Sequence, residues 1–191
     1  MAIPAAFTLM GIDKLSNSFV TDSLGEDIAK IVRQHAIAST ALALASAIPG
    51  AGAVACIACQ TAVVYSMYVR INNALNIRLS KNIMKSLASC VVANLASNAI
   101  TIIGGVVASS VLSIIPGVGT AASTALMGSI GYATAMISAV VYTKMLTTIV
   151  GSGKKIENMS EAEIKEAVQE EIKKRDINQD ISLTTSAGRA T

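Results

Sequence analysis

Two long apolar segments, each interrupted near its middle by a short proline–glycine motif, dominate the hydrophobic pattern of the chain. They cover Gln34–Val69 and Ser86–Thr143, and neither contains a charged residue. Proline lacks the backbone N–H and glycine tolerates a left-handed conformation, so each motif ends one helix and lets the next begin. The pattern therefore predicts two hydrophobic helical hairpins, with structural turns at Pro49, Gly50, Gly52, Pro116, Gly117 and Gly119.

The spacing of apolar residues predicts four main helices, over 24–47, 51–74, 81–112 and 120–150. Gly104 and Gly105 indicate a bend or break in the third. Runs of β-branched residues within 91–107 also occur in strands, but the apolar segments are much longer than strands usually are. The predicted fold class is all-α. The expected organisation is an N-terminal segment at 1–23 with a short amphipathic helix over 5–19, a double-hairpin domain at 24–150, a linker and amphipathic helix at 151–175, and a flexible tail at 176–191.

The C-terminal amphipathic helix has the clearest local signals. Ser160 followed by Glu163 fits a capping box, in which each side chain satisfies a free backbone N–H group, and Ser23 with Glu26 fits another. Apolar residues then recur at helical spacing, and Lys173, Lys174 and Arg175 close the helix, as its dipole favours. We expect a charged helix with one apolar face.

Charge is distributed unevenly along the chain. No acidic residue lies between Asp27 and Glu157, and the basic residues of that interval border the apolar segments. A soluble bundle of this length normally has charges of both signs over its outer face. Composition agrees, since 52% of residues are hydrophobic and 14% are charged, while a net charge of +3 is too small to indicate nucleic-acid binding. The basic connector between the hairpins contains Arg70, Arg78, Lys81 and Lys85.

Membrane lipid is therefore the expected surrounding of the two hairpins. A span needs about 20 apolar residues, which Ser86–Thr143 supplies in both arms. The first hairpin is shorter, so it is either re-entrant or spans with snorkelling basic residues. The positive-inside rule places the connector and both termini in the cytoplasm of a bacterial inner membrane. Two stripes of small residues at four-residue spacing would let helices pack closely in lipid, although an alanine-rich soluble core gives the same spacing. The stripes are Ser39, Ala43 and Ala47, and Ala121, Ala125, Ser129 and Ala133.

The order of these features resembles the DUF697 family of bacterial proteins. A proline–glycine turn leads into a helix with Gln60 and Tyr65, a basic break follows, and the second turn leads into a small-residue helix with Gly131 and Tyr142. The resemblance covers roughly residues 36–145. It implies a hydrophobic helical module like those of YcjF-like inner-membrane proteins, often linked to a GTPase, and no catalytic residues. Unlike the fused members, this chain carries no GTPase domain.

Candidate chemistry is sparse. Gly151-Ser152-Gly153-Lys154-Lys155 departs from a phosphate-binding loop at both ends and follows a helix rather than a strand, so a flexible basic linker is favoured. Cys56 and Cys59 form a C-x-x-C pair, a redox or metal motif in other settings, but packing residues are favoured here. His35 suits a pH sensor or, more simply, a hydrogen-bonded packing residue. We predict no enzyme, no cofactor and no metal.

Polar residues inside the apolar segments are better candidates, because each needs a partner in a dry setting. Gln60, Asn94 and Asn98 are predicted helix contacts. Three functions remain open. The first is a membrane-integrated hairpin module that self-associates or docks a separate GTPase through its charged helix. The second is a pore-forming protein that is soluble before insertion, and the third is a soluble helical scaffold.

Overall fold

The computed structural model describes residues 26–46, 53–109 and 118–174, with side chains described at 26–44, 57–97 and 128–174. These residues form helices and no strand, which confirms the all-α class. The elements are α2 (Glu26–Ser46), α3 (Ala53–Leu75), α4 (Lys81–Ser109), α5 (Val118–Gly151), the short 3-10 helix η2 (Ile156–Asn158) and α6 (Glu161–Lys173).

The helix bounds agree with the sequence pattern to within a few residues, except at Gly104-Gly105. α4 continues through both glycines, so the predicted break is wrong, while the alternative of a bend stays a prediction. Glycine inside a helix costs only about 1 kcal/mol relative to alanine, and no proline accompanies this pair, so the helical hydrogen bonding persists. Gly119 lies in the first turn of α5. Several predicted features lie outside the described residues: the turn residues Pro49, Gly50, Gly52, Pro116 and Gly117, the helix over 5–19, the capping box at Ser23 and the tail over 176–191.

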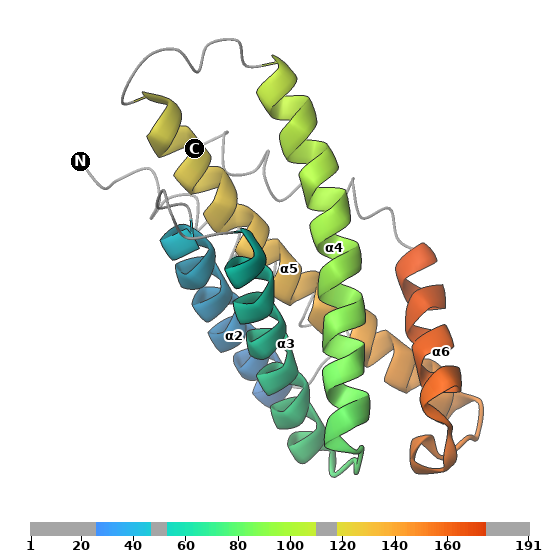
Figure 1. The fold of residues 1–191 in the computed structure, drawn as a ribbon. Coiled ribbons are helices and arrows are strands. Elements are labelled where there is room, and N and C mark those ends of the chain that lie inside the picture. The colour runs from blue at the N-terminus through green and yellow to red at the C-terminus, as the bar shows by residue number, and fades with distance from the viewer. Residues whose placement is uncertain (1–25, 47–52, 110–117, 175–191) are drawn as a thin grey trace.

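Helices α2 to α5 run antiparallel to their neighbours in sequence (Figure 1). α5 is the central helix, in contact with α2, α3, α4 and α6. Its most extensive contact is with α2, while α4 touches α5 far less. The strongest pairing of the described residues therefore joins the two predicted hairpins rather than the arms of the second one.

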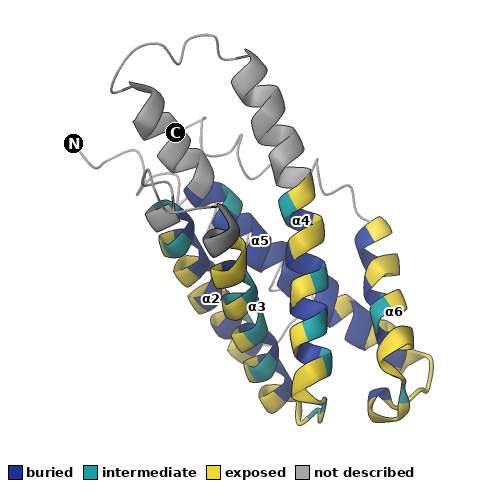
Figure 2. Ribbon diagram, viewed as in Figure 1, coloured by how far each residue is buried: buried dark blue, intermediate teal, exposed yellow. Residues whose placement is uncertain are grey.

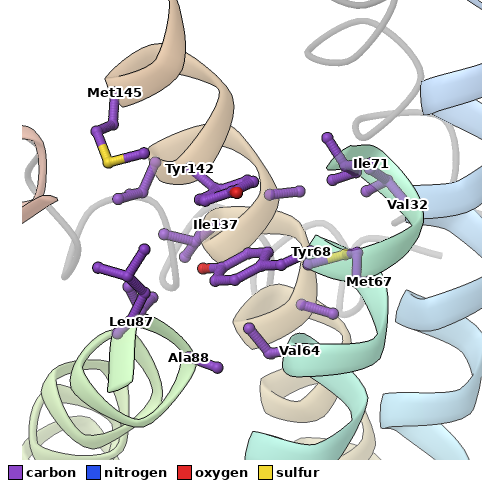
Figure 3. Packing of buried hydrophobic residues seen from close by; sticks show 14 of the residues in the cluster. Val32, Val64, Met67, Tyr68, Ile71, Leu87, Ala88, Ile137, Tyr142 and Met145 are labelled. Carbon is purple, nitrogen blue, oxygen red and sulfur yellow. The ribbon is translucent and has the colours of Figure 1, made fainter. Parts of the chain in front are cut away.

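The core of the bundle is built from the inward faces of all these helices. Figure 3 shows Tyr68 of α3 and Tyr142 of α5 facing each other, with Leu87 of α4 beside them. The two tyrosine rings are stacked, with centroids 4.0 Å apart and planes 14° from parallel. Such a pair contributes about 1 kcal/mol beyond the burial of its area. It locks α3 onto α5.

Helix α6 covers the side of the bundle formed by α4 and α5 (Figures 1 and 2). The capping box at its start is confirmed: the Ser160 hydroxyl accepts from the Glu163 N–H at 3.3 Å, and the Glu163 carboxylate accepts from the Ser160 N–H at 2.8 Å. Its apolar residues Ile164, Val168 and Ile172 are buried in the common core. The apolar face of this helix is thus occupied within the chain.

Candidate membrane interface

The described bundle has a charged end and an uncharged end. We define the charged end as residues 26–33 of α2, 70–75 of α3, 81–85 of α4 and 144–151 of α5, and the uncharged end as the remainder of these four helices. Because the helices alternate in direction, all four charged parts meet at one end of the bundle (Figure 1).

Four side-chain contacts align the helices near the border between these two ends. The Arg70 guanidinium donates to the Gln34 side-chain oxygen at 2.8 Å, which ties α3 to α2. The Asn72 side chain accepts from the Tyr142 hydroxyl at 2.7 Å and donates to the Met84 sulfur at 3.2 Å, which ties α3 to α5 and α4. Beside the first contact, the His35 ring bonds the Ile31 carbonyl at 2.7 Å and the Ser66 hydroxyl at 3.3 Å. His35 therefore serves as a packing residue between α2 and α3.

The outer surface differs between the two ends. At the charged end the exposed residues include Arg70, Lys81 and Lys85 of the predicted basic connector, and its fourth residue, Arg78, is exposed between α3 and α4. Exposed large apolar residues occur at both ends: Leu75 and Val150 are 42% and 62% exposed at the charged end, and Ile37 and Ile57 are 54% and 38% exposed at the uncharged end. Around Ile37 and Ile57 the exposed side chains are small, such as Ala41 and Ala62. The described surface of the uncharged end is thus free of charge, although it includes exposed amide side chains at Gln34 and Asn94.

One helix of the described part is long and apolar enough to cross a membrane. It is Gly128–Gly151 of α5, and 72% of its most apolar stretch is buried inside the bundle. A core helix of a water-soluble protein passes the same length and composition test, so burial matters here. Most of the apolar character of α5 is explained by its burial at the centre of the bundle rather than by contact with lipid.

Gln60 lies at a junction of three helices within the uncharged end. Its side-chain N–H donates to the Ser39 carbonyl at 2.9 Å, and its side-chain oxygen accepts from the Ser39 hydroxyl. The Gly131 carbonyl oxygen of α5 lies 2.7 Å from the same hydroxyl and shares its single proton with the Gln60 oxygen. Gln60 and Ser39 are both buried, so this junction satisfies polar groups that water does not reach.

Gly131 allows α2 and α5 to cross closely at that junction. A Cβ atom at this position would lie 2.7 Å from the Ser39 carbonyl oxygen and 2.6 Å from the Ala43 Cβ. Two members of the predicted small-residue stripe on α2 thus meet α5 here. Sequence reasoning singled out Ser129 and Ala133, which are buried, and missed Gly131 as the contact point. The pair Gly128 and Gly131 on one helix face was the available signal.

The other two predicted contact residues are placed differently. Asn94 lies at an exposed position of α4, where its amide donates to the Cys90 carbonyl of the same helix at 2.8 Å. The side chain of Asn98 lies outside the described residues. The bonds of Gln60 join α3 to α2.

The remaining candidate sites have local structural roles. The Gly151–Lys155 segment ends α5: backbone N–H groups of Ser152 and Gly153 bond carbonyls of the last turn, and Gly153 takes a left-handed φ of 74°. Cys59 is a free, exposed thiol, and the side chain of Cys56 lies outside the described residues. Within the described part of the chain, no group of histidine, cysteine or acidic residues is arranged to hold a metal ion.

Comparison of the chain with models of protein families, with curated proteins and with solved structures gives no match. Function must therefore be inferred from the bundle itself.

Proposed function

We propose that the protein is a membrane-integrated helical hairpin module, whose uncharged end inserts into lipid while its charged end stays in water. The observation that supports this most is that every charged residue of α2 to α5 lies at one end of the bundle. A charge at the centre of a bilayer costs about 3 kcal/mol, whereas in water charges along the whole outer face favour solubility. Lipid around the uncharged end explains why charged residues are missing there, and water around the other end explains why they are present.

The bacterial inner membrane is the proposed location, with the charged end and both termini on the cytoplasmic side. Basic residues without acidic neighbours in α3 and α4 support this orientation, because positive residues are retained in the cytoplasm. The uncharged parts of α4 and α5 are the proposed spans. The shorter uncharged parts of α2 and α3 would reach part of the way.

The proposed partner is either a second copy of this chain or a separate GTPase, and the resemblance to the DUF697 family supports the GTPase. The apolar face of α6 is occupied by the core, so the proposed docking surface is its outward face, where Glu166 and Glu170 are exposed. Replacing both with lysine should abolish co-purification of GTP-hydrolysing activity with the tagged protein. The matched control, Lys154→Glu with Lys155→Glu, reverses two exposed charges elsewhere and should leave co-purification intact. Equal effects of the two variants would reject the outward face of α6 as the docking surface.

A pair of arginine substitutions on α3 tests the membrane proposal. Ala62 and Ala74 are both exposed on this helix, the first at the uncharged end and the second at the charged end. Ala62→Arg should move the protein from the membrane fraction to the soluble fraction, and Ala74→Arg should not. Equal membrane yields of the two variants would contradict insertion by the uncharged end.

A pore-forming protein that is soluble before insertion is the second candidate. The burial of 72% of the most apolar stretch of Gly128–Gly151 favours it, since such a helix would be shielded from water until the bundle opens. Purification without detergent followed by dye release from liposomes would support this function. A detergent-free protein that leaves liposomes intact would instead support a soluble helical scaffold.

A further inference from the structure

Four basic residues lie at one level of the bundle, one on each of the four main helices. They are Arg33 of α2, Arg70 of α3, Lys85 of α4 and Lys144 of α5, and all four are exposed. Each is the charged residue that directly borders the uncharged part of its helix. We infer that this basic collar binds the anionic headgroups of a phospholipid bilayer. The inference rests on the proposed function and adds the class of lipid to it.

The common level follows from contacts between neighbouring residues. Gln34, next to Arg33, accepts from the Arg70 guanidinium at 2.8 Å. Two residues beyond Arg70, Asn72 contacts the Met84 sulfur at 3.2 Å and the Tyr142 hydroxyl at 2.7 Å. Met84 is adjacent to Lys85, and Tyr142 is two residues before Lys144. The four helices therefore change from charged to uncharged in register, although they are far apart in sequence.

Among the four main helices, acidic residues occur only in the first turn of α2, where Glu26 and Asp27 lie six or more residues before Arg33. No acidic residue occurs between Asp27 and Glu157, so α3, α4 and α5 contain none. Helix α6 brings carboxylates beside α4 and α5, and two of these carboxylates form ion pairs with lysines close to them in sequence. Glu161 pairs with Lys165 at 2.8 Å, and Glu171 pairs with Lys174 at 2.8 Å. Hydrogen bonds from Lys165 and Ser86 hold the pKa of Glu161 below its usual value, so it stays ionised and paired.

A bilayer fits the collar better than a small anion does. The four side chains come from four separate helices and are exposed, rather than converging on one buried pocket. Above the collar, the uncharged parts of α4 and α5 extend roughly 36 Å and 39 Å at 1.5 Å per residue. A hydrocarbon core is about 30 Å thick, so a bundle inserted by its uncharged end would hold the collar at headgroup depth. Arginine and lysine at that depth bind anionic lipid.

Flotation of the full-length protein with two kinds of vesicle tests the collar. One vesicle contains phosphatidylcholine alone, and the other adds phosphatidylglycerol. The collar variant replaces Arg33, Arg70, Lys85 and Lys144 with glutamine. The control variant replaces four exposed basic residues away from the collar: Lys30, Arg78, Lys81 and Lys154. Both variants change the net charge from +3 to −1 (3 − 4 = −1). Circular dichroism verifies that both retain helical structure.

We expect wild type to prefer anionic vesicles, by about five-fold in binding constant for each collar residue. The collar variant should lose this preference, and the control should keep more of it, because Lys30 and Lys81 lie about one helical turn farther from the uncharged end than Arg33 and Lys85 do. Electrostatic attraction to the headgroups weakens with distance, over a Debye length of about 8 Å. Equal losses in the two variants, or an unchanged preference in the collar variant, would overturn the collar. Equal binding of wild type to both vesicles would also overturn it while leaving the membrane proposal intact. Binding to neither would reject the membrane proposal itself.

Discussion

The charged and uncharged ends use the same four helices but differ in the charge of their surfaces. At the charged end the surface carries ionic side chains, and the core holds residues such as Ile71, Met84 and Met145. At the uncharged end the surface lacks charge, and α2 crosses α5 through Ser39 and Gly131. Helix formation does not require such a change of surface along a helix. We propose that the difference in surface charge reflects what surrounds each end, and the close approach of α2 and α5 follows from the small residues that meet at Gly131.

The largest predicted effect comes from filling the close crossing at the uncharged end. Gly131→Leu should lower the free energy of unfolding by about 3 kcal/mol, because the added atoms displace the Ser39 backbone and Ala43. Gly151→Leu is the control at the charged end, where an added Cβ meets no atom within 4 Å. It should change stability by no more than about 1 kcal/mol, in the stabilising direction. Chemical denaturation compares the two, and similar midpoints would argue against the crossing.

A smaller effect is expected at the border between the two ends. Tyr142→Phe removes the hydroxyl that donates to Asn72 and leaves a buried oxygen without that donor. The expected loss is about 2 kcal/mol in the free energy of unfolding. Tyr65→Phe, at a half-buried position of α3, should cost less than about 0.5 kcal/mol. If the two variants had the same free energy of unfolding, the hydrogen bond from Tyr142 to Asn72 would not be a significant source of stability.

The capping box should contribute less again. Ser160→Ala is expected to destabilise α6 by about 1 kcal/mol, because the N–H of Glu163 loses its acceptor. Ser89→Ala, on the exposed face of α4, is the control and should have an effect below about 0.5 kcal/mol. Amide hydrogen exchange of α6 is the measurement. Unchanged protection in Ser160→Ala would show that burial of Ile164 and Val168 alone holds the helix.

Acid should produce the smallest effect. Hydrogen bonds from the Ser160 backbone and side chain hold the pKa of Glu163 below its usual 4.5. The resulting stabilisation is complete above pH 4.5 and is lost as the pH falls through the lower pKa of the folded state. Exchange protection of α6 should therefore decrease in wild type below pH 4.5, and less so in Glu163→Gln. Parallel pH profiles for the two proteins would contradict the role of this carboxylate.

Local signals explain what the sequence could predict. Proline–glycine motifs and changes in charge mark helix ends, so α2, α3, α4 and α5 begin and end close to the predicted residues. The capping box at Ser160 could be identified because both of its partners lie within four residues. Glycine signals were overinterpreted at Gly104-Gly105, where the helix continues.

Contacts between distant residues could not be predicted in the same way. A buried Gln60 needs a partner, but nothing in the sequence identifies Ser39 as that partner or Gly131 as the third group. The stacked tyrosines and Asn72 likewise meet only after four helices have been aligned. The pattern of α6 indicated a buried apolar face without indicating what covers it. The structure assigns that face to the core of the same chain.

The most direct test of the central claim is the depth of each end in a bilayer. Two single-cysteine proteins suffice: one retains Cys59, exposed at the uncharged end, with the other cysteines replaced by serine, and one carries Ala74→Cys at the charged end without Cys59. An environment-sensitive fluorophore on each is then exposed to quenchers attached to lipid or dissolved in water. The account predicts that the label at Cys59 is quenched from lipid and the label at position 74 from water. Quenching of both labels from water, in protein bound to vesicles, would contradict insertion by the uncharged end.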